Sequence, residues 1–353
     1  FGGLSCCDRE SGDPFRVFGH CNNFSMGGWA SVGYHTKNLP LFNSYKDKVQ
    51  LHQGWLYAEK TLDTSNGGDI GGRVDYLYGT DGPNTQAFGT GRGWDNDWDN
   101  GGQYGHAIPQ LYLEAGYGDF SVIAGHFYTI IGYEVVPATG NFFYSHAYTF
   151  NFSEPFTHTG VLGKYAPSDD VTVWGGYSFG WDSGFDDNGD AFLGGVSLGL
   201  TDDLTLTYAT VGGRFGSAAF NGTEKGYMHS IVADYALTDS VQYIFQHDLL
   251  TTDDATDTRV RESYGINQYL IKTINDCWGV GARFEWWNAD GPGFGVPPGD
   301  QDIYALTLGV NYRPHANVIV RPEIRWDWDD SRTFLEGNDD QQTTCLLYTS
   351  PSP

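Results

Sequence analysis

Residues 318–328 read VIVRPEIRWDW, and the alternation of polarity in this stretch decides the fold. Successive side chains of a β-strand point to opposite faces, so every second residue shares one environment. One face carries Val318, Val320, Pro322, Ile324, Trp326 and Trp328. The other face carries Arg321, Glu323, Arg325 and Asp327. The stretch therefore predicts a strand with one apolar face and one charged face.

The same pattern recurs along the chain in short segments that are separated by turns. The other candidate strands are Trp29–Thr36, Val49–Leu62, Asp69–Tyr78, Ile108–Tyr117, Phe120–Tyr128, His146–Phe152, Thr157–Tyr165, Val171–Trp181, Ala191–Leu200, Leu204–Gly213, Tyr227–Leu237, Val241–Leu250, Glu262–Ile274, Trp278–Trp287 and Ile303–Arg313. No segment shows a convincing helical period. The sequence therefore predicts an all-β fold of about 16 to 18 strands, with about 16 preferred.

Two kinds of all-β protein place such strands in different surroundings. In a soluble sheet the apolar face covers a core, whereas in a membrane barrel it faces lipid and the polar face lines a wet lumen. Apolar faces that end in Tyr or Trp, charged faces that also carry Gly and Ser, and short turns that alternate with long acidic connections favour the barrel. We therefore expect a single antiparallel transmembrane β-barrel that closes on itself. A soluble or surface-associated β-rich protein that binds glycans or acts in adhesion is the alternative.

Composition excludes some classes of function. The chain has 353 residues without a linker-like tract, which favours one large domain. Asp and Glu number 44 against 19 Lys and Arg, giving a net charge of −25. Nucleic acids bind basic side chains, so no nucleic-acid partner is expected. There is no run of about 18 apolar residues, so no transmembrane helix is predicted, although barrel strands need no such run.

The two ends of the chain differ from the repeating middle. Residues 1–27 are predicted to form an irregular lead-in, and residues 28–344 the barrel, with a closing strand that is truncated. Residues 345–353 break the alternation and resemble a translated sequencing adapter, so we expect them to be non-native. Disulfide pairing among Cys6, Cys7 and Cys21 stays open.

The stretch 125–160 interrupts the rhythm in the middle of the chain. Within it, VVPATG at residues 135–140 cannot form a central strand, because Pro lacks a ladder donor and Gly weakens pairing. We expect an internal loop, with residues 135–144 narrowing the lumen as a constriction. The candidate residues of this loop are His126, Glu134, Asn141, Tyr144, His146, Glu154 and His158.

These histidines and acids have more than one interpretation. Their spacing matches no compact metal motif, so we expect the acids to bond loop backbone or luminal arginines rather than a metal. Ser145 and His146 are adjacent and would face opposite sides of a strand, which argues against a catalytic dyad. We therefore predict neither an enzyme nor a cofactor.

Charged residues on the inward faces are the candidate pore lining: Arg73, Asp75, Arg283, Glu285, Arg313, Arg321, Glu323, Arg325 and Asp327. Opposed charges across a pore set ion preference. The same residues could instead form salt-bridged ladders that stabilise the wall, and both interpretations are kept. Weak calcium candidates in an outer loop are Asp182, Asp186, Asp187 and Asp190, where solvated carboxylates are the default expectation.

Four motifs carry a resemblance that covers about residues 28–327. They are GGRVDYLYGTD (71–81), AIPQLYLEAGYGD (107–119), GHFYTIIGYEVVPATGNFFYSHAYTFNFSEPFTHTGVLGKY (125–165) and GVNYRPHANVIVRPEIRWDW (309–328). In these motifs the chain resembles the OmpL-like β-barrel porins of bacterial outer membranes. The resemblance implies an outer-membrane channel for passive diffusion of small hydrophilic solutes or ions, and no catalytic residue is carried over from it. A homotrimer in outer-membrane lipid stays open, and a barrel enzyme is the remaining alternative.

Overall fold

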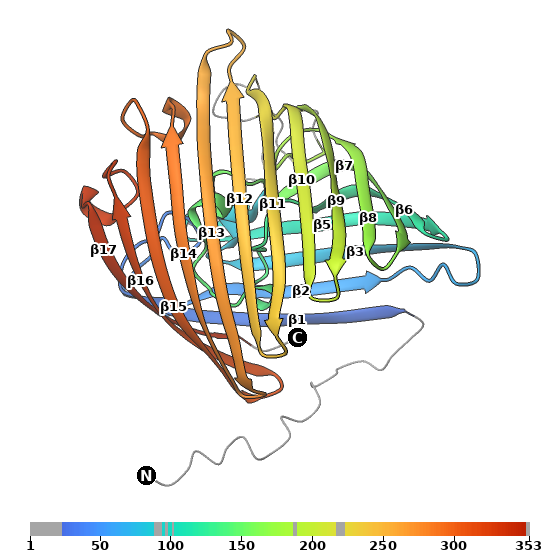
Figure 1. Ribbon diagram of the computed structural model, residues 1–353, viewed down its shortest axis with the longest axis horizontal. Coiled ribbons are helices and arrows are strands. Elements are labelled where there is room, and N and C mark those ends of the chain that lie inside the picture. Colours follow the sequence, from blue (N-terminus) through green and yellow to red (C-terminus); the bar gives the residue numbers. More distant parts are fainter. Residues whose placement is uncertain are drawn as a thin grey trace.

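The computed structural model describes residues 23–87, 94–95, 98–100, 102–185, 189–216 and 223–350. In this part of the chain the strands form one antiparallel sheet that closes into a barrel (Figure 1). The strands are β1 (Phe24–His35), β2 (Gln50–Lys60), β3 (Gly68–Gly79), β4 (Asp99–Asn100), β5 (Tyr104–Tyr117), β6 (Phe120–Tyr128), β7 (Thr157–Ser168), β8 (Val171–Ser178), β9 (Asp190–Thr201), β10 (Leu204–Arg214), β11 (Lys225–Thr238), β12 (Val241–Asp253), β13 (Arg259–Asn275), β14 (Trp278–Asp290), β15 (Gln301–His315), β16 (Val318–Asp329) and β17 (Gln341–Ser350). The helices are short: α1 (Gly82–Thr85), α2 (Tyr148–Phe152) and single turns at Ala138–Gly140, Pro292–Phe294 and Glu336–Asn338.

Each strand of the barrel wall pairs with the next one along the chain. Of the 17 strands in the described sheet, the two-residue β4 pairs only with β5, so 16 form the wall. β17 pairs with β1 over Val32–His35 and Leu346–Thr349, which closes the ring. A closed sheet leaves no row of unpaired backbone groups, as a lipid environment requires. The predicted fold class and strand number are confirmed.

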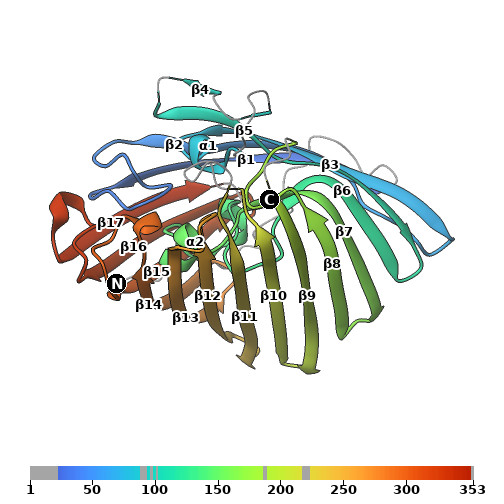
Figure 2. The same ribbon diagram turned by 90° about the horizontal axis from the view of Figure 1, so that it is seen from above.

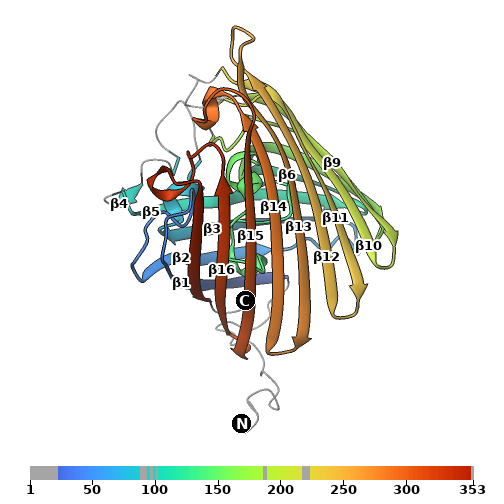
Figure 3. The same cartoon turned by 60° about the vertical axis from the view of Figure 1, so that its left-hand side comes forward.

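The connections differ at the two ends of the barrel. Those after β5, β7, β9, β11, β13 and β15 are two residues long, whereas those after β6, β8, β14 and β16 are much longer. In Figure 3 the turns that join β11 to β12, β13 to β14 and β15 to β16 lie along the lower edge, and the connections after β12 and β14 lie at the opposite edge. We call these the short-turn end and the long-loop end.

The alternation in sequence becomes an outer and an inner face. Along β16, Arg321, Glu323, Arg325 and Asp327 are buried inside the barrel, while Trp328 on the other face is exposed. Large apolar side chains are strongly exposed around the outside, including Leu56, Ile70, Leu113, Phe192 and Leu347. This inverts the pattern of a soluble protein and suits a surface that contacts lipid.

Two sequence expectations differ from the structure in detail. Residues 146–152 were expected to form a strand, but they include the helix α2. The reason is that this segment lies inside the barrel, where the Tyr148 N–H bonds the Glu285 carboxylate at 2.9 Å instead of a neighbouring strand. The sheet also extends from Phe24 to Ser350, beyond the expected limits of 28 and 344. That residues 345–353 are non-native stays a prediction, but the buried Leu346 and Tyr348 contribute to the closing strand.

No helix in the described segments is long and apolar enough to span a membrane.

The outer surface yields a first prediction. Leu113 is 69% exposed and precedes the exposed Tyr117 by four residues. With the rise per residue of a strand and the usual tilt of barrel strands, this spacing places Leu113 about 10 Å deeper in the apolar band than Tyr117. Leu113→Arg should lower the free energy of unfolding in a bilayer by about 2–4 kcal/mol, because the charge must enter hydrocarbon. Denaturant titration in vesicles measures this, and Leu113→Met is the matched control. A loss below about 0.5 kcal/mol would mean that this face does not contact lipid.

Candidate functional site

Residues 129–156 connect β6 to β7 and lie inside the barrel; we call them the luminal loop. Figure 2 shows the loop's helix α2 within the ring of strands. The loop bonds inward side chains of the wall from β12 round to β2. The expected internal loop is therefore present.

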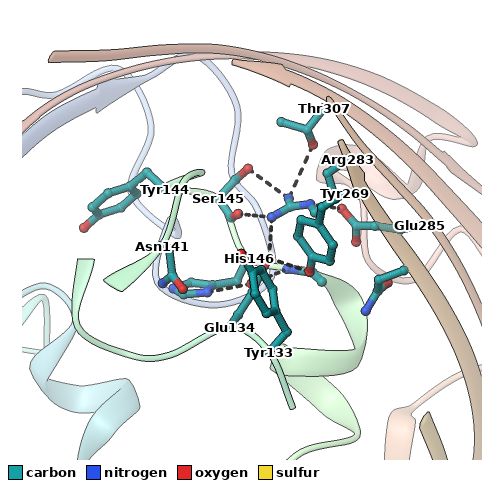
Figure 4. Close-up of polar contacts among 12 residues, drawn as sticks. Tyr133, Glu134, Asn141, Tyr144, Ser145, His146, Tyr269, Arg283, Glu285 and Thr307 are labelled. Atoms are coloured by element: carbon teal, nitrogen blue, oxygen red, sulfur yellow. Dashed lines mark hydrogen bonds and ion pairs between the residues drawn. The ribbon is translucent and has the colours of Figure 1, made fainter. Parts of the chain in front are cut away.

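Arg283 of β14 is the main anchor of the luminal loop (Figure 4). Its guanidinium is fully buried and bonds Glu134 at 2.7 Å, Glu285 at 2.8 Å, Thr307 at 3.3 Å and the Ser145 hydroxyl at 3.1 Å. A further bond goes to the Ser145 carbonyl. All five N–H donors of the guanidinium are therefore used.

Glu134 is the loop's counterpart to Arg283. Besides Arg283, it accepts hydrogen bonds from Tyr269 Oη at 2.9 Å, the Ala147 N–H at 3.0 Å and His146 Nδ1 at 2.9 Å. Burial opposes ionisation of this carboxyl, but Arg283 and the His146 bond outweigh it and lower the pKa of Glu134 to about 2. Glu134 therefore stays ionised and joins the loop to β13 and β14.

A second cation extends the network to β16. Arg325 bonds Asp327 at 2.7 Å, Glu285 at 3.1 Å and the His146 carbonyl at 2.9 Å. Tyr148 of the loop contacts both acids, through its N–H to Glu285 at 2.9 Å and its hydroxyl to Asp327 at 3.1 Å. The arginines are thus satisfied by acids on the same wall and by the loop, which supports the ladder interpretation of these charges.

The loop tip is held by β16 and by the wall beyond the closing strand. Glu323 accepts bonds from the Tyr144 and Ser145 N–H groups and from the Ser145 hydroxyl at 2.9 Å. Arg321 donates to the Ala138 carbonyl. From β2, Gln53 donates to the Val136 carbonyl at 2.8 Å and accepts from the Ala138 N–H at 3.0 Å.

Wall glycines make room for loop side chains. A Cβ on Gly281 would lie 2.6 Å from the Phe142 ring, and one on Gly309 would lie 2.9 Å from the Phe143 ring. Such distances are far below van der Waals contact. The small residues on these inner faces therefore leave space for side chains of the loop, in addition to widening the lumen.

The other expected loop residues lie apart from the Arg283 network. His126 of β6 and His158 of β7 bond threonines at 2.7 and 3.1 Å, and Asn141 bonds the backbone of Val135. Glu154 bonds Gln246 of β12 at 2.7 Å. These contacts fix the roots and the tip of the loop.

Of the remaining charge candidates, Arg73 and Asp75 form a separate pair on β3 at 2.6 Å, joined by Glu59 at 3.2 Å. Arg313 is exposed at the end of β15. The structure therefore brings β14, β16 and the loop together and leaves Arg73 and Arg313 outside that group. Gln53 and Tyr148 anchor the loop but were not predicted, since uncharged residues on alternating strands carry no distinguishing signal.

An apolar cluster occupies the inside of the barrel towards the long-loop end. Inward residues there are fully buried, including Leu193, Val211, Met228, Leu250 and Ile303. Aromatic side chains from the outer connections cover the cluster, namely Trp181, Phe215, Phe294 and Phe334. This end of the lumen is consequently filled by apolar side chains.

Two of the calcium candidates are placed and two, Asp186 and Asp187, lie outside the described residues. Asp182 is buried and accepts the Phe156 and Thr157 N–H groups at 2.6 and 2.8 Å, so it caps the end of the luminal loop. Asp190 pairs with Arg214 on the outer surface. Among described residues, no group of three or more His, Cys, Asp or Glu could hold a metal ion.

The Arg283 network gives a second prediction. Arg283→Met should lower the free energy of unfolding by about 3–5 kcal/mol, because it leaves buried Glu134 without its arginine and Glu285 with Arg325 alone. Adding Glu134→Gln should restore part of the loss. Lys225→Met, which removes an exposed ion pair with Asp257, is the control and should cost about 0–1 kcal/mol. Denaturant titration measures these free energies. If Arg283→Met and Lys225→Met lower the free energy of unfolding equally, Arg283 does not anchor the loop.

Asp182 gives a pH prediction. Burial raises its pKa from 3.8 to about 7, against the lowering effect of the Thr157 and Phe156 N–H groups. The folded state therefore binds the proton more tightly than the unfolded state, and stability should fall as pH rises from about 4 to about 7. Asp182→Asn keeps an acceptor oxygen and should lose this part of the pH dependence. Parallel curves of unfolding free energy against pH for the two proteins would refute the assignment.

Comparison with known proteins agrees with this architecture. The family model for putative beta-barrel porin-2, OmpL-like, matches residues 23–350. No curated protein matches the chain. Among solved structures, OmpT of Vibrio cholerae, an outer membrane protein in a trimer form, aligns with a TM-score of 0.63 at 12% identity, covering 93% of this chain and 99% of that one. The outer membrane channel DcaP of Acinetobacter baumannii aligns at 0.62 and 8% identity, covering 96% and 99%.

The anion-selective porin of Comamonas acidovorans aligns at 0.61 and 10% identity, covering 93% and 99% of the two chains. At such identities the three structures show a shared fold. The family match covers most of the chain, and it confirms the resemblance seen in the motifs. The chain belongs to the putative beta-barrel porin-2, OmpL-like family, and it is a porin of the bacterial outer membrane.

Proposed function

We propose that small hydrophilic solutes and ions diffuse passively between the luminal loop and the part of the wall that the loop does not bond. Inward side chains remain partly exposed there towards the short-turn end. They are polar or charged, as in Glu114, Lys164, Ser197, Thr207 and Asp234. Partial exposure of polar inward groups supports a wet passage on this side.

The luminal loop would set the size limit of this passage. The observation that carries this proposal is the complete satisfaction of buried Arg283 by loop and wall together. Moving the loop aside would take Glu134 away from Arg283 and leave three of the five Arg283 donors without acceptors, which costs several kcal/mol in a buried site. The constriction is therefore a fixed one, and the apolar cluster at the long-loop end narrows the route further.

A mild cation preference follows from the charges along the proposed passage. Among the inward residues that are partly or fully exposed, Glu59, Glu114 and Asp234 are acidic, whereas Arg73 and Lys164 are basic. Rings and patches of one charge sign favour permeation by the opposite sign. The net charge of −25 for the whole chain acts in the same direction.

The site supports a channel rather than an enzyme. The Ser145 hydroxyl bonds Glu323 and Arg283, while His146 Nδ1 bonds Glu134. In a serine triad the hydroxyl bonds a histidine, whereas Ser145 and His146 bond different partners. The two neighbours thus serve the attachment of the loop, and we propose no catalytic role for them.

Outer-membrane lipid and further copies of the chain are the proposed partners. The exposed apolar outer face supports contact with lipid. One similar structure, OmpT of Vibrio cholerae, is described in a trimer form. We extend that assembly to this chain as a homotrimer.

Conductance tests the function directly. The refolded protein in a planar bilayer under a KCl gradient should give small, discrete steps of conductance. Its reversal potential should show selectivity for cations. Glu114→Gln combined with Asp234→Asn should shift the reversal potential towards anions, because both side chains face the proposed passage. Asp257→Asn, in an outer connection, is the control and should shift it little. Anion selectivity of the wild type, or insertion without any steps, would defeat the proposal.

A further inference from the structure

Two buried carboxylates meet where the luminal loop ends, and in the described part of the chain neither pairs with an arginine of the Arg283 network. Glu154 of the loop is 4% exposed and Asp248 of β12 is 1% exposed. Nε2 of Gln246 donates to both, at 2.7 Å to Glu154 and 2.6 Å to Asp248. The two acids therefore lie within reach of a single amide group. None of the ion pairs in the described part of the chain links either of them to an arginine or lysine.

Several oxygens around these acids have no hydrogen-bond partner. They are Glu154 Oε2, Asp248 Oδ1, Ser230 Oγ and Asn267 Oδ1. Ser230 lies opposite Asp248 in the β11–β12 register, and Asn267 lies opposite Gln246 in the β12–β13 register. Both side chains are 1% exposed. Ser230 and Glu154 are hydrogen-bonding neighbours of Asp248, so inward oxygens from adjacent strands and from the loop converge here with more acceptor than donor capacity, which is rare for buried polar atoms.

The charge of this group is also uncompensated. Two neighbouring carboxylates in a buried site cannot both ionise unless something balances them. Burial, and then the neighbouring Asp248, raise the pKa of Glu154 well above its ordinary value. Either a proton or a bound cation is needed.

The loop backbone closes tightly over the group. Gly132 has a φ of +85°, and a Cβ at this position would lie 1.8 Å from Glu154 Oε2. Only glycine permits both this conformation and this approach. The unpartnered Glu154 oxygen is therefore enclosed between the two roots of the luminal loop rather than open to bulk water.

We propose that Glu154, Asp248, Ser230 and Asn267 bind a hard divalent cation such as Ca²⁺, which fastens the end of the luminal loop to β11, β12 and β13. All four groups would bind the cation through oxygen atoms, the ligand type that calcium and magnesium select. A charge of +2 balances the two carboxylates. The inference concerns the attachment of the loop and does not depend on which solutes the porin admits.

Calcium binding and its effect on stability provide the test. Protein in detergent, stripped with a chelator, should bind one Ca²⁺ by calorimetry, and Ca²⁺ should raise its Tm. Glu154→Gln and Asp248→Asn should each weaken Ca²⁺ binding at least tenfold and abolish the rise in Tm. Asp257→Asn, which changes an exposed acid in an outer connection, should bind as the wild type does.

Other outcomes overturn the proposal. If Ca²⁺ and Mg²⁺ leave wild-type Tm unchanged while raising the pH lowers it, and Glu154→Gln removes that pH dependence, the pair shares a proton instead. If Ca²⁺ raises the Tm of Glu154→Gln as much as that of the wild type, the ion binds elsewhere. Should both acidic variants fail to fold, Ser230→Ala removes one ligand without changing charge, and unchanged Ca²⁺ affinity in that variant would count against the site.

Discussion

The burial of positive charge on the inner wall is the constraint on which the interior depends. Arg283 and Arg325 project from β14 and β16 into a space that is closed to water. Their neighbours two residues along the same strands, Glu285 and Asp327, neutralise part of this charge. Most of the remaining donors bond acceptors of the luminal loop, through Glu134 and the carbonyls of Ser145 and His146. The wall and the loop are therefore complementary halves of one polar network.

This arrangement reverses the usual division between core and surface. Outside, leucines and aromatic residues meet an apolar solvent, so their exposure is favourable. Inside, the polar network and the aromatic residues of the loop take the place of a conventional core. The glycines at 281 and 309 belong to this packing, because any larger residue would displace a phenylalanine of the loop.

The barrel itself could be predicted from sequence because alternation with period two depends only on local geometry. The same pattern misled at residues 146–152, where FNF alternates as a strand does but the backbone groups bond the wall and form α2. Charged inward residues were found, yet the bond from Arg283 to Glu134 joins positions 149 apart in sequence, and one sequence carries no information on that pairing. Asp182 was expected as a solvated acid, but its burial beneath the loop depends on the tertiary fold.

The seam between β1 and β17 is held by four residue pairs, from Val32–Thr349 to His35–Leu346. Tyr144 of the loop spans this seam. Its N–H bonds Glu323 on one side, its hydroxyl bonds Asp81 beyond β3 at 3.1 Å, and its ring stacks on Tyr348 of β17. The loop thus bridges the shortest strand pairing of the described barrel wall. Because Tyr144 contacts residues on both sides of this seam, closure of the barrel and seating of the loop stabilise each other.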